Sequence, residues 1–429
     1  MWFPTPRKPE LPALIAWAGC WCPNIVFFKE TILLTLSRNH KPLENINMDK
    51  SDFSTQSSQG LRLRRKAYLA LLLVVLALLM FNTRSHFPDI SQHADMIPSS
   101  PISVGLNNEI PNIVHYVQLS KSADAEFHFE FKHFLSVYSS VVYLRPKTIY
   151  LHTDFSEEAI RKVLVSEDPR HKWTRRLLSL KAVKVRHVRA PTVAAGNGKR
   201  IEKIQHKSDF VRMDAIYEFG GLYMDFDVLP LRDITSLRRS GFKNIVGREH
   251  GGQINNGCWL SAPKTAMVDI FRSEASEIFD GRWTTHSCRL LTKVSERLVR
   301  TPGEVLIMDM LAFAPSSWVD EDVKKLWTIH NETSIFPEDD IDFTIQDPYQ
   351  RWNRRKKVAE WENDWSASYF LHSFDRHGKI PAEFKGGVNV REVMYPRSNF
   401  GLLTHPVLKD AMKNGLVFEE DAEDDDDLK

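Results

Sequence analysis

The chain has 429 residues, of which 42% are hydrophobic, and its formal net charge is +2. This length and composition indicate a globular protein with one large domain and additional segments. The nearly neutral charge argues against a nucleic-acid-binding protein, which would carry a surplus of basic residues.

One strongly apolar segment lies near the N-terminus, at residues 67–83. It begins with AYLALLLVVLALLMF and directly follows a basic cluster that ends at Lys66. The run is short for an average bilayer but suits the thinner membranes of the early secretory pathway, and no A-x-A cleavage site follows it. We therefore predict a signal-anchor transmembrane helix of a single-pass type II protein, with residues 1–66 in the cytoplasm and the bulk of the chain in the lumen of the Golgi or endoplasmic reticulum. A cleaved signal peptide and a buried helix are the alternatives.

The segments on either side of this run lack a steady hydrophobic period. Residues 1–47 either form a long cytoplasmic tail or precede a second start at Met48 and belong to a gene-model extension. Residues 84–109 are predicted to form a short stem. The globular domain is predicted at 110–415, and the acidic residues 416–429 are predicted to be a disordered tail.

From residue 110 onward, strand-like and helix-like patterns alternate. The pattern predicts strands at 110–119, 148–152 and 183–188, and helices at 124–141 and 156–165. Strands that alternate with helices predict an α/β fold with a mostly parallel sheet. Such sheets bind ligands at the carboxyl ends of their strands.

The most informative stretch is 209–230, which reads DFVRMDAIYEFGGLYMDFDVLP. Its first half predicts a helix that has Ser208 as N-cap and ends at Gly220. Asp209 and Arg212 are three residues apart and therefore share a face of this helix.

The second half of the stretch alternates between apolar residues and Tyr223, Asp225 and Asp227. A period of two predicts a half-buried strand with both carboxylates on its exposed face. Like charges on one strand face repel each other, so the pair requires a cation. Mg²⁺ and Mn²⁺ are held by one or two carboxylates together with substrate phosphates. The pattern therefore favours a metal–diphosphate site over a solvated face.

The compound pattern S-D-x-x-R followed by G-G-x-Y-x-D-x-D resembles the DXD-containing sugar-binding glycosyltransferases of family 32. That family includes fungal initiation mannosyltransferases and sphingolipid sugar transferases. The resemblance implies a GT-A-like, Rossmann-type nucleotide-sugar-binding fold. It also implies transfer of a hexose, with retention, from a nucleotide-diphosphate sugar to a glycan or glycolipid hydroxyl. GDP-mannose is the first choice of donor, UDP-galactose and UDP-N-acetylglucosamine are the next, and association with other glycosyltransferases is a further expectation.

The resemblance assigns roles to the residues of the compound pattern. It makes Asp227 a direct ligand of Mn²⁺ or Mg²⁺, and Asp225 a contact of the ribose or, through water, of the metal. Asp209 and Arg212 would hydrogen-bond the donor sugar, and Arg212 would also offset charge near the phosphate. Tyr223 would pack beside the ribose or the phosphates.

Looser matches add further candidate site residues. His115 would lie on a first strand that reaches the donor nucleotide, unless it is an incidental core residue. Asn255 and Asn256 would line the donor and acceptor pocket, unless Asn256 opens an Asn-Gly turn. His372, followed by Phe374 where the family commonly has Trp, would ligate the metal or a phosphate, unless it is a core histidine.

Three points remain open on the sequence alone. Asn331 lies in the only N-glycosylation sequon and is the predicted glycosylation site if this part is lumenal. Cys258 and Cys288 would lie in an oxidising lumen, which permits a disulfide without establishing one. Two other functions stay in view: an inactive membrane-tethered partner subunit, and a metal-dependent phosphohydrolase that would recruit further ligands from other strands.

Overall fold

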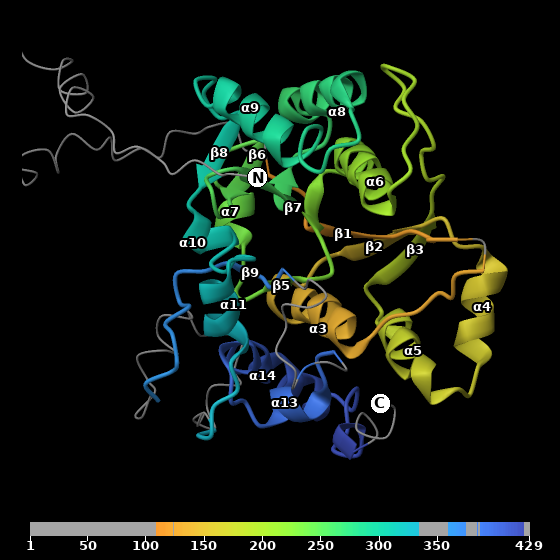
Figure 1. The fold of residues 1–429 in the computed structure, drawn as a ribbon, viewed down its shortest axis with the longest axis vertical. Coiled ribbons are helices and arrows are strands. Elements are labelled where there is room, and N and C mark those ends of the chain that lie inside the picture. The colour runs from red at the N-terminus through yellow and green to blue at the C-terminus, as the bar shows by residue number, and fades with distance from the viewer. Residues whose placement is uncertain (1–108, 123, 334–358, 375–383, 385–386, 424–429) are drawn as a thin grey trace, which may run out of the picture. The chain divides into compact units, whose positions relative to one another are not determined.

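The structure is a computed structural model that describes residues 109–122, 124–333, 359–374, 384 and 387–423 (Figure 1). All of them lie within one of the two units of the chain, Ser100–Lys429. The predicted membrane anchor at 67–83, the cytoplasmic tail and nearly all of the stem fall outside the described residues. Among the helices of the described part, none combines the length and apolar character of a membrane span.

A seven-stranded sheet has the strand order β3-β2-β1-β4-β7-β6-β8. Its strands are β1 (Ile113–Gln118), β2 (Thr148–Thr153), β3 (Val183–His187), β4 (Gly221–Met224), β6 (Asn244–Arg248), β7 (Ile254–Ser261) and β8 (Val305–Met308). β1 pairs in parallel with β2 and β4, β2 with β3, and β6 with β8, whereas β7 is antiparallel to both of its neighbours. The predicted α/β fold with a mostly parallel sheet is confirmed.

Helices cover both faces of this sheet (Figure 1). One face carries α6 (Ile204–Phe219), α8 (Ala266–Ile278) and α9 (Cys288–Leu298), and the other carries α3 (Phe131–Ser139) and α5 (Lys172–Ser179). The other α-helices of the described residues are α4 (Glu157–Val165), α7 (Thr235–Arg238), α10 (Met310–Phe313), α11 (Asp320–Trp327), α13 (Val390–Met394) and α14 (Asn399–Lys413).

β4 is buried on both of its faces, because helices cover both sides of the sheet. Leu222 and Met224 belong to the core cluster that includes α3, while Tyr223 belongs to the cluster that includes α6. The predicted alternation is therefore present. The predicted exposed face is wrong, since Tyr223 is only 1% exposed.

The Asp-x-Asp pattern is also not one continuous strand. β4 ends at Met224, and β5 (Val228–Pro230) belongs to a separate two-stranded sheet with β9 (Phe370–His372). Asp225 and Asp227 lie in the turn between β4 and β5, which a hydrogen bond of 3.0 Å from the Val228 amide to the Asp225 carbonyl closes. The prediction of one strand through both carboxylates is wrong, because the chain changes sheets between them.

Helix α6 begins earlier than predicted, with Lys203 as its N-cap residue, so Ser208 lies inside the helix. The predicted end is confirmed: Gly220 is the C-cap residue, with φ of 62°. Gly221 follows with φ of 104°, and a Cβ there would overlap the carbonyl oxygen of Ile113 on the adjacent β1. The two glycines thus allow the sharp passage from helix to central strand.

The folded part continues past the predicted boundary at residue 415. Val417 and Asp421 are buried, and the Asp421 carboxylate pairs with Arg176 at 2.6 Å and with Lys172 at 3.5 Å. At least one acidic residue of the predicted tail is therefore an anchor on α5.

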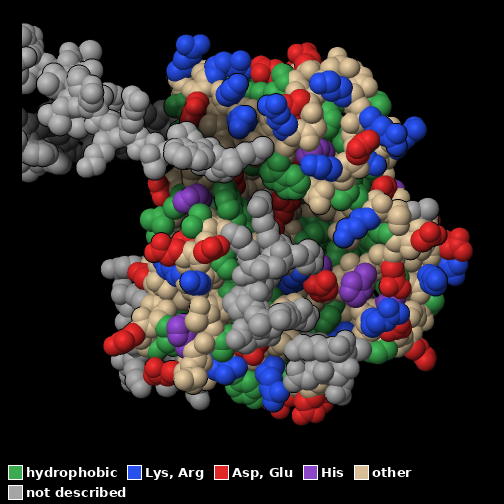
Figure 2. Space-filling view, viewed as in Figure 1, with side chains coloured by type: hydrophobic (Ala, Val, Ile, Leu, Met, Phe, Trp, Pro, Cys, Tyr) green, Lys and Arg blue, Asp and Glu red, His purple; other side chains and the backbone are tan. Residues whose placement is uncertain are grey.

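Charges of both signs are interspersed over the described surface on the face drawn in Figure 2. This distribution agrees with the near-neutral composition of the chain.

Candidate active site

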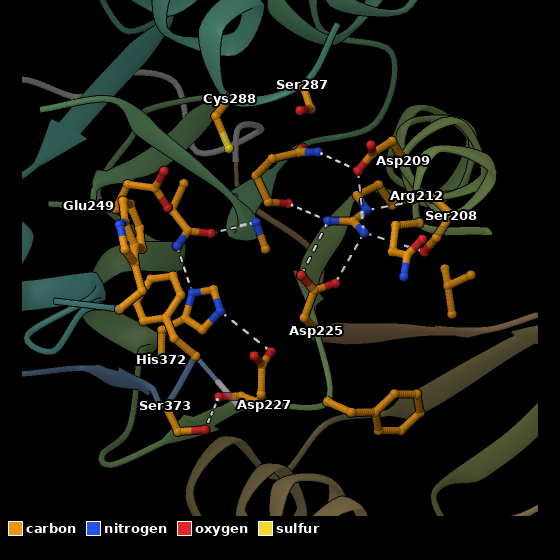
Figure 3. Close-up of a pocket in the computed structure, with 18 of the residues that line it drawn as sticks. Ser208, Asp209, Arg212, Asp225, Asp227, Glu249, Ser287, Cys288, His372 and Ser373 are labelled. Atoms are coloured by element: carbon orange, nitrogen blue, oxygen red, sulfur yellow. Dashed lines mark hydrogen bonds and ion pairs between the residues drawn. The ribbon is translucent and has the colours of Figure 1, made fainter. Parts of the chain in front are cut away.

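A pocket of about 680 Å³ lies at the carboxyl ends of β1 and β4. The strand order of the parallel half of the sheet reverses between these two strands, which is where doubly wound sheets form ligand crevices. The wall includes the end of β1, one side of α6, the turn that follows β4, the start of β7 and the residues that follow β9. Figure 3 shows the acidic, basic and thiol side chains that converge there.

Asp225 is held by two neighbours on the pocket wall. Arg212 Nη2 lies 3.2 Å from its Oδ1, and the Tyr223 hydroxyl donates to the same oxygen at 2.5 Å. Burial raises the pKa of Asp225; Arg212 acts in the opposite direction, and the charge of Asp227 adds to the rise. A carboxylate pair in this state gains from a positive charge placed between its members.

His372 lies beside Asp227 because β9 pairs with β5. Val228 and His372 are opposite each other in this ladder, and His372 Nε2 is 3.4 Å from Asp227 Oδ1. Burial acts to lower the pKa of His372, but the carboxylates of Asp227 and Asp225 outweigh burial and raise it. The pairing of His372 with the acidic turn is therefore electrostatic as well as geometric.

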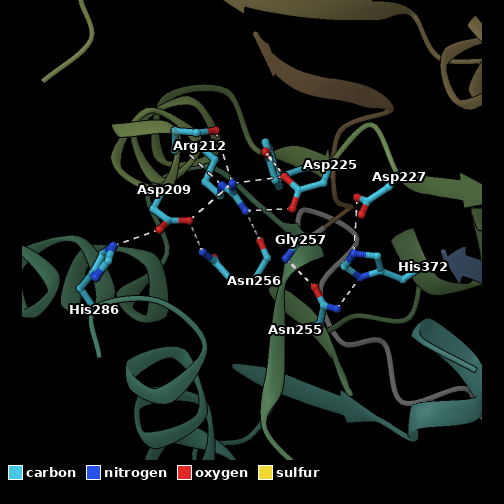
Figure 4. A network of polar contacts seen from close by, with 11 residues as sticks. Asp209, Arg212, Asp225, Asp227, Asn255, Asn256, Gly257, His286 and His372 are labelled. Atoms are coloured by element: carbon cyan, nitrogen blue, oxygen red, sulfur yellow. Dashed lines mark hydrogen bonds and ion pairs between the residues drawn. The ribbon is translucent and has the colours of Figure 1, made fainter. Parts of the chain in front are cut away.

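Asn255 connects His372 to the backbone of β7 (Figure 4). The Gly257 amide donates to Asn255 Oδ1 at 2.5 Å, and Asn255 Nδ2 is 2.6 Å from His372 Nδ1. Because a backbone N–H only donates, the amide nitrogen of Asn255 faces His372, and Nδ1 accepts. In this arrangement the neutral ring carries its proton on Nε2, toward Asp227. Metal ligation by Nε2 would require that proton to leave, so the predicted ligand role of His372 stays a prediction.

The opposite wall is a second polar network, centred on Asp209 (Figure 4). Asp209 Oδ1 accepts from Asn256 Nδ2 at 2.9 Å and lies 3.4 Å from Arg212 Nη2. Its Oδ2 lies 2.9 Å from His286 Nε2. Arg212 Nη1 also donates to the Asn256 carbonyl at 2.9 Å. The structure thus brings the predicted site residues Asp209, Arg212 and Asn256 together.

Arg212 joins the two networks. Arg212 is 6% exposed, and its guanidinium contacts Asp209 on one side and Asp225 on the other, at 3.4 Å and 3.2 Å. Burial alone would lower the pKa of Arg212, but the neighbouring carboxylates outweigh burial and raise it. Its position fits both an ion-pair role and a substrate-binding role.

Asn255 and Asn256 both lie in β7, not in a turn. The Asn-Gly turn that the sequence left open is therefore wrong. β7 is antiparallel to β4, and Met224 pairs with Cys258, so the beginning of β7 lies beside the end of β4. This pairing brings the amides to the carboxylates.

Tyr223 does not contact the pocket directly. It is 1% exposed and is not among the pocket-lining residues. The Arg212 Cζ lies 4.4 Å from the centre of its ring, and its hydroxyl donates to Asp225. The predicted contact with ribose or phosphate is wrong, because the ring supports Arg212 and Asp225 from behind.

His115 is a core residue. It is fully buried, does not line the pocket, and has Nε2 2.8 Å from the Gly220 carbonyl and Nδ1 2.9 Å from His152 Nε2. Burial lowers the pKa of His115 to about 4, so the ring is neutral. The predicted donor contact is wrong: the side chain fastens β1 to the end of α6.

Residues 132–245 match the family model for a glycosyltransferase sugar-binding region containing a DXD motif. The predicted family resemblance is confirmed. The matched sugar-binding region contains Asp209, Arg212, Asp225 and Asp227. It ends within β6, so the amides of β7 and His372 lie outside the match.

Two curated relatives are similar to parts of this chain. An uncharacterized protein of Arabidopsis thaliana is 29% identical over 116 residues, which cover 26% of this chain and 17% of that protein. Glucan organizing enzyme 1 of Cryptococcus neoformans var. grubii is 22% identical over 229 residues, which cover 50% of this chain and 57% of the relative. The matched region thus spans less than two thirds of the length of either relative.

Solved structures show more distant similarity. PaToxG glycosyltransferase is 13% identical with a TM-score of 0.33, covering 44% of this chain and 70% of that one. The glycosyltransferase GlyE of Streptococcus pneumoniae TIGR4 is 12% identical with a TM-score of 0.31, covering 72% of this chain and 64% of that one. Similarity at this level carries no argument about function.

The sugar-binding region fits a divalent cation held mainly by substrate and water. Asp225 and Asp227 have side chains that are 32% and 28% exposed toward the pocket. Within the described residues, no group of three or more His, Cys, Asp and Glu side chains has the arrangement of a metal site. One or two carboxylates together with phosphate oxygens are a coordination that Mg²⁺ accepts.

Several residues in or beside the pocket were not identified as site residues from the sequence. Glu249 follows β6, is 7% exposed and lines the pocket. Cys288 lines it as well, and both it and Cys258 are free thiols. A Cβ on Gly257 would lie 2.6 Å from Asp225 Oδ2, so that position needs a glycine. His286 lies 77 residues from its partner Asp209, a separation that no local pattern reveals.

Proposed function

We propose that this protein is a metal-dependent glycosyltransferase that moves a hexose from a nucleotide-diphosphate sugar to a hydroxyl of a glycan or glycolipid. The observation that carries the proposal is that the matched sugar-binding region delivers Asp209, Arg212, Asp225 and Asp227 to one pocket. A GT-A-type donor site is the architecture that we propose for this crevice.

The proposed reaction joins the acceptor oxygen to the anomeric carbon while the bond to the diphosphate oxygen breaks, and the proton of the acceptor hydroxyl passes to the departing diphosphate. Negative charge develops on the departing diphosphate. Arg212, already fixed by its contacts to Asp225 and Asn256, offsets this charge without further reorganisation. A divalent cation at Asp225 and Asp227 would supply Lewis-acid stabilisation of the leaving diphosphate when bound.

We propose Mn²⁺ or Mg²⁺ as the cation, retention of anomeric configuration, and GDP-mannose as the first donor to test, followed by UDP-galactose and UDP-N-acetylglucosamine. The name of the cryptococcal relative refers to glucan, which supports a glycan as the acceptor class. Association with other glycosyltransferases is part of the proposal.

The test is thermal stabilisation of the full-length chain by each of these nucleotide sugars, with and without Mn²⁺. A ligand that binds the folded state raises its apparent stability, so the correct donor raises Tm and does so mainly when Mn²⁺ is present. Release of the nucleoside diphosphate in the presence of acceptor confirms turnover. Hydrolysis of phosphodiesters without any effect of nucleotide sugars would favour a phosphohydrolase, and donor binding without release would favour an inactive partner subunit.

We further propose that residues 67–83 anchor the protein in the Golgi or endoplasmic reticulum membrane with the pocket in the lumen. Asn331 is exposed, as a glycan acceptor must be. An endoglycosidase should shift the mobility of the parent chain and not that of Asn331→Gln. In sealed microsomes, a C-terminal tag should survive added protease and an N-terminal tag should be trimmed. The reverse pattern would contradict the lumenal location.

A further inference from the structure

His133 lines the pocket at the start of α3 and has no part in the function proposed above. Gln118 and Asp227 also line this pocket. The His133 ring packs edge-on against Phe226, with 5.3 Å between ring centres, and against Phe129, with 5.8 Å. Both contacts fix the ring against the acidic turn.

The backbone determines which ring nitrogen of His133 carries hydrogen. The Glu130 amide donates to His133 Nδ1 at 2.8 Å, and a backbone N–H only donates, so Nδ1 is an acceptor. Burial lowers the pKa of His133 to about 4, which leaves the ring neutral with a single hydrogen. That hydrogen is therefore on Nε2.

The Nε2–H group is available to a ligand. His133 lines the pocket and is only partly buried, and among the described residues its side chain is hydrogen-bonded at Nδ1 alone. The preorganised ring thus presents a hydrogen-bond donor at the pocket surface. Preorganisation of this kind lowers the entropic cost of binding.

The surroundings of the Nε2–H group select an anionic acceptor. Lys121 and Lys132, the chain neighbour of His133, also line the pocket, and Lys132 pairs with Glu130 at 3.1 Å. Phe226, whose ring contacts His133, lies between Asp225 and Asp227 in the chain, so the His133 ring lies beside the turn that carries the proposed cation position. A diphosphate held by a cation at the acidic turn would carry its oxygens toward this edge of the pocket.

We infer that His133 is a donor-binding residue whose Nε2–H group donates a hydrogen bond to a diphosphate oxygen of a nucleoside diphosphate. The inference rests on the proposed function. The same side chain caps helix α3, so α3 would contribute directly to binding of the leaving diphosphate.

Two substitutions separate the binding role from the capping role. His133→Asn keeps an acceptor near the position of Nδ1 and removes the Nε2 donor, whereas His133→Gln keeps a donor near Nε2 and removes the cap acceptor. We expect His133→Asn to keep the Tm of the ligand-free chain and to weaken binding of UDP or GDP about tenfold or more, as expected for a charge-assisted hydrogen bond. We expect His133→Gln to lower Tm and to bind the nucleoside diphosphate more tightly than His133→Asn does.

The measurements are calorimetric binding of UDP, GDP and inorganic pyrophosphate by the full-length chain in Mn²⁺, together with Tm. The control is His187→Asn, on the edge strand β3, which should change none of them. Equal affinities in the parent and His133→Asn would overturn the inference, and so would a loss confined to UDP and GDP while pyrophosphate binding is unchanged. If the parent itself binds no nucleoside diphosphate, the result contradicts the proposed function, on which the inference about His133 rests.

Discussion

The two polar walls of the pocket differ in how far the charges of their carboxylates are compensated by neighbouring protein groups. In the wall built by α6 and β7, Asp209 accepts from Asn256 and His286 and pairs with Arg212, so its charge is compensated within the protein. In the turn between β4 and β5, burial raises the pKa of Asp225, and the charge of Asp227 adds to the rise. The wall around Asp209 is therefore stable without a ligand, whereas the turn that carries Asp225 and Asp227 would be stabilised by a bound cation.

The contrast distinguishes groups that orient neighbouring side chains from groups that are suited to binding a cation or substrate. A carboxylate with three internal donors, such as Asp209, is suited to fixing the geometry of its neighbours. Carboxylates that lack full compensation at a strand end are suited to receiving a cation and the phosphates bound to it. Substitutions in the two walls should therefore have different signatures.

The largest effect is expected at the turn. Asp227→Ala should lower turnover by at least about a hundredfold, because it removes a carboxylate of the proposed cation site. It should also remove most of the Mn²⁺-dependent rise in Tm caused by the donor, while the circular dichroism spectrum stays that of the parent. The matched control is Asp269→Ala, an exposed carboxylate on α8, which should be nearly silent. Near-normal activity of Asp227→Ala, or indifference of the parent to a chelator, would contradict the cation site.

The second largest loss of turnover is expected from a substitution at Gly257, beside the turn. Gly257→Ala places a Cβ 2.6 Å from Asp225 Oδ2, so the carboxylate or the strand must shift. A displacement of about 1 Å at a reacting site can cost about a hundredfold in rate. Gly251→Ala is the control, since that residue has φ of 84° and open space around it. Gly251→Ala should lower Tm through backbone strain and leave turnover unchanged, whereas Gly257→Ala should lower turnover.

Arg212→Lys tests the residue that joins the two walls. An ammonium cannot reproduce the simultaneous contacts to Asp209, Asp225 and the Asn256 carbonyl, so kcat should fall about tenfold to a hundredfold and Tm should fall as well. The control is Arg272→Lys, which affects an exposed pair with Asp214 at 2.7 Å and should change stability by about 0–1 kcal/mol. Unchanged kinetics in Arg212→Lys would reduce Arg212 to a helix-face partner of Asp209.

The smallest effect is a pH dependence of the metal-free protein. Because the pKa of Asp225 is raised in the folded state, folding favours its protonated form, and this contribution is lost as pH rises through the raised pKa. With chelator present, Tm of the parent relative to Asp225→Asn should therefore fall as pH increases above the ordinary Asp range. Added Mn²⁺ should remove this fall. A difference between the two chains that is independent of pH would contradict the electrostatic account of the turn.

Local patterns predicted a large part of this fold. The end of α6 at Gly220, the shared helix face of Asp209 and Arg212, and the alternating burial of β4 follow from short-range rules of chain geometry. They could be predicted because a helix face repeats every three to four residues and a strand face every two.

Other parts of the site depend on pairings between distant segments. Asn256 lies beside Asp209 only because β7 runs antiparallel to β4, and His372 reaches Asp227 only because β9 pairs with β5. Neither pairing has a local sequence signal. The same is true of His286, whose contact with Asp209 spans 77 residues.

The sequence by itself determined the α/β class and the family resemblance, and an Asp-x-Asp pair after a Gly-Gly helix end predicted a nucleotide-sugar site. The tertiary structure decided which candidate side chains face that site. Tyr223 and His115 have residue types and positions that suit substrate binding, yet both are buried, because helices cover both faces of the sheet and their polar atoms bond inside the protein. Residue type and spacing are local properties, whereas exposure and partnership are set by every segment that packs around a residue.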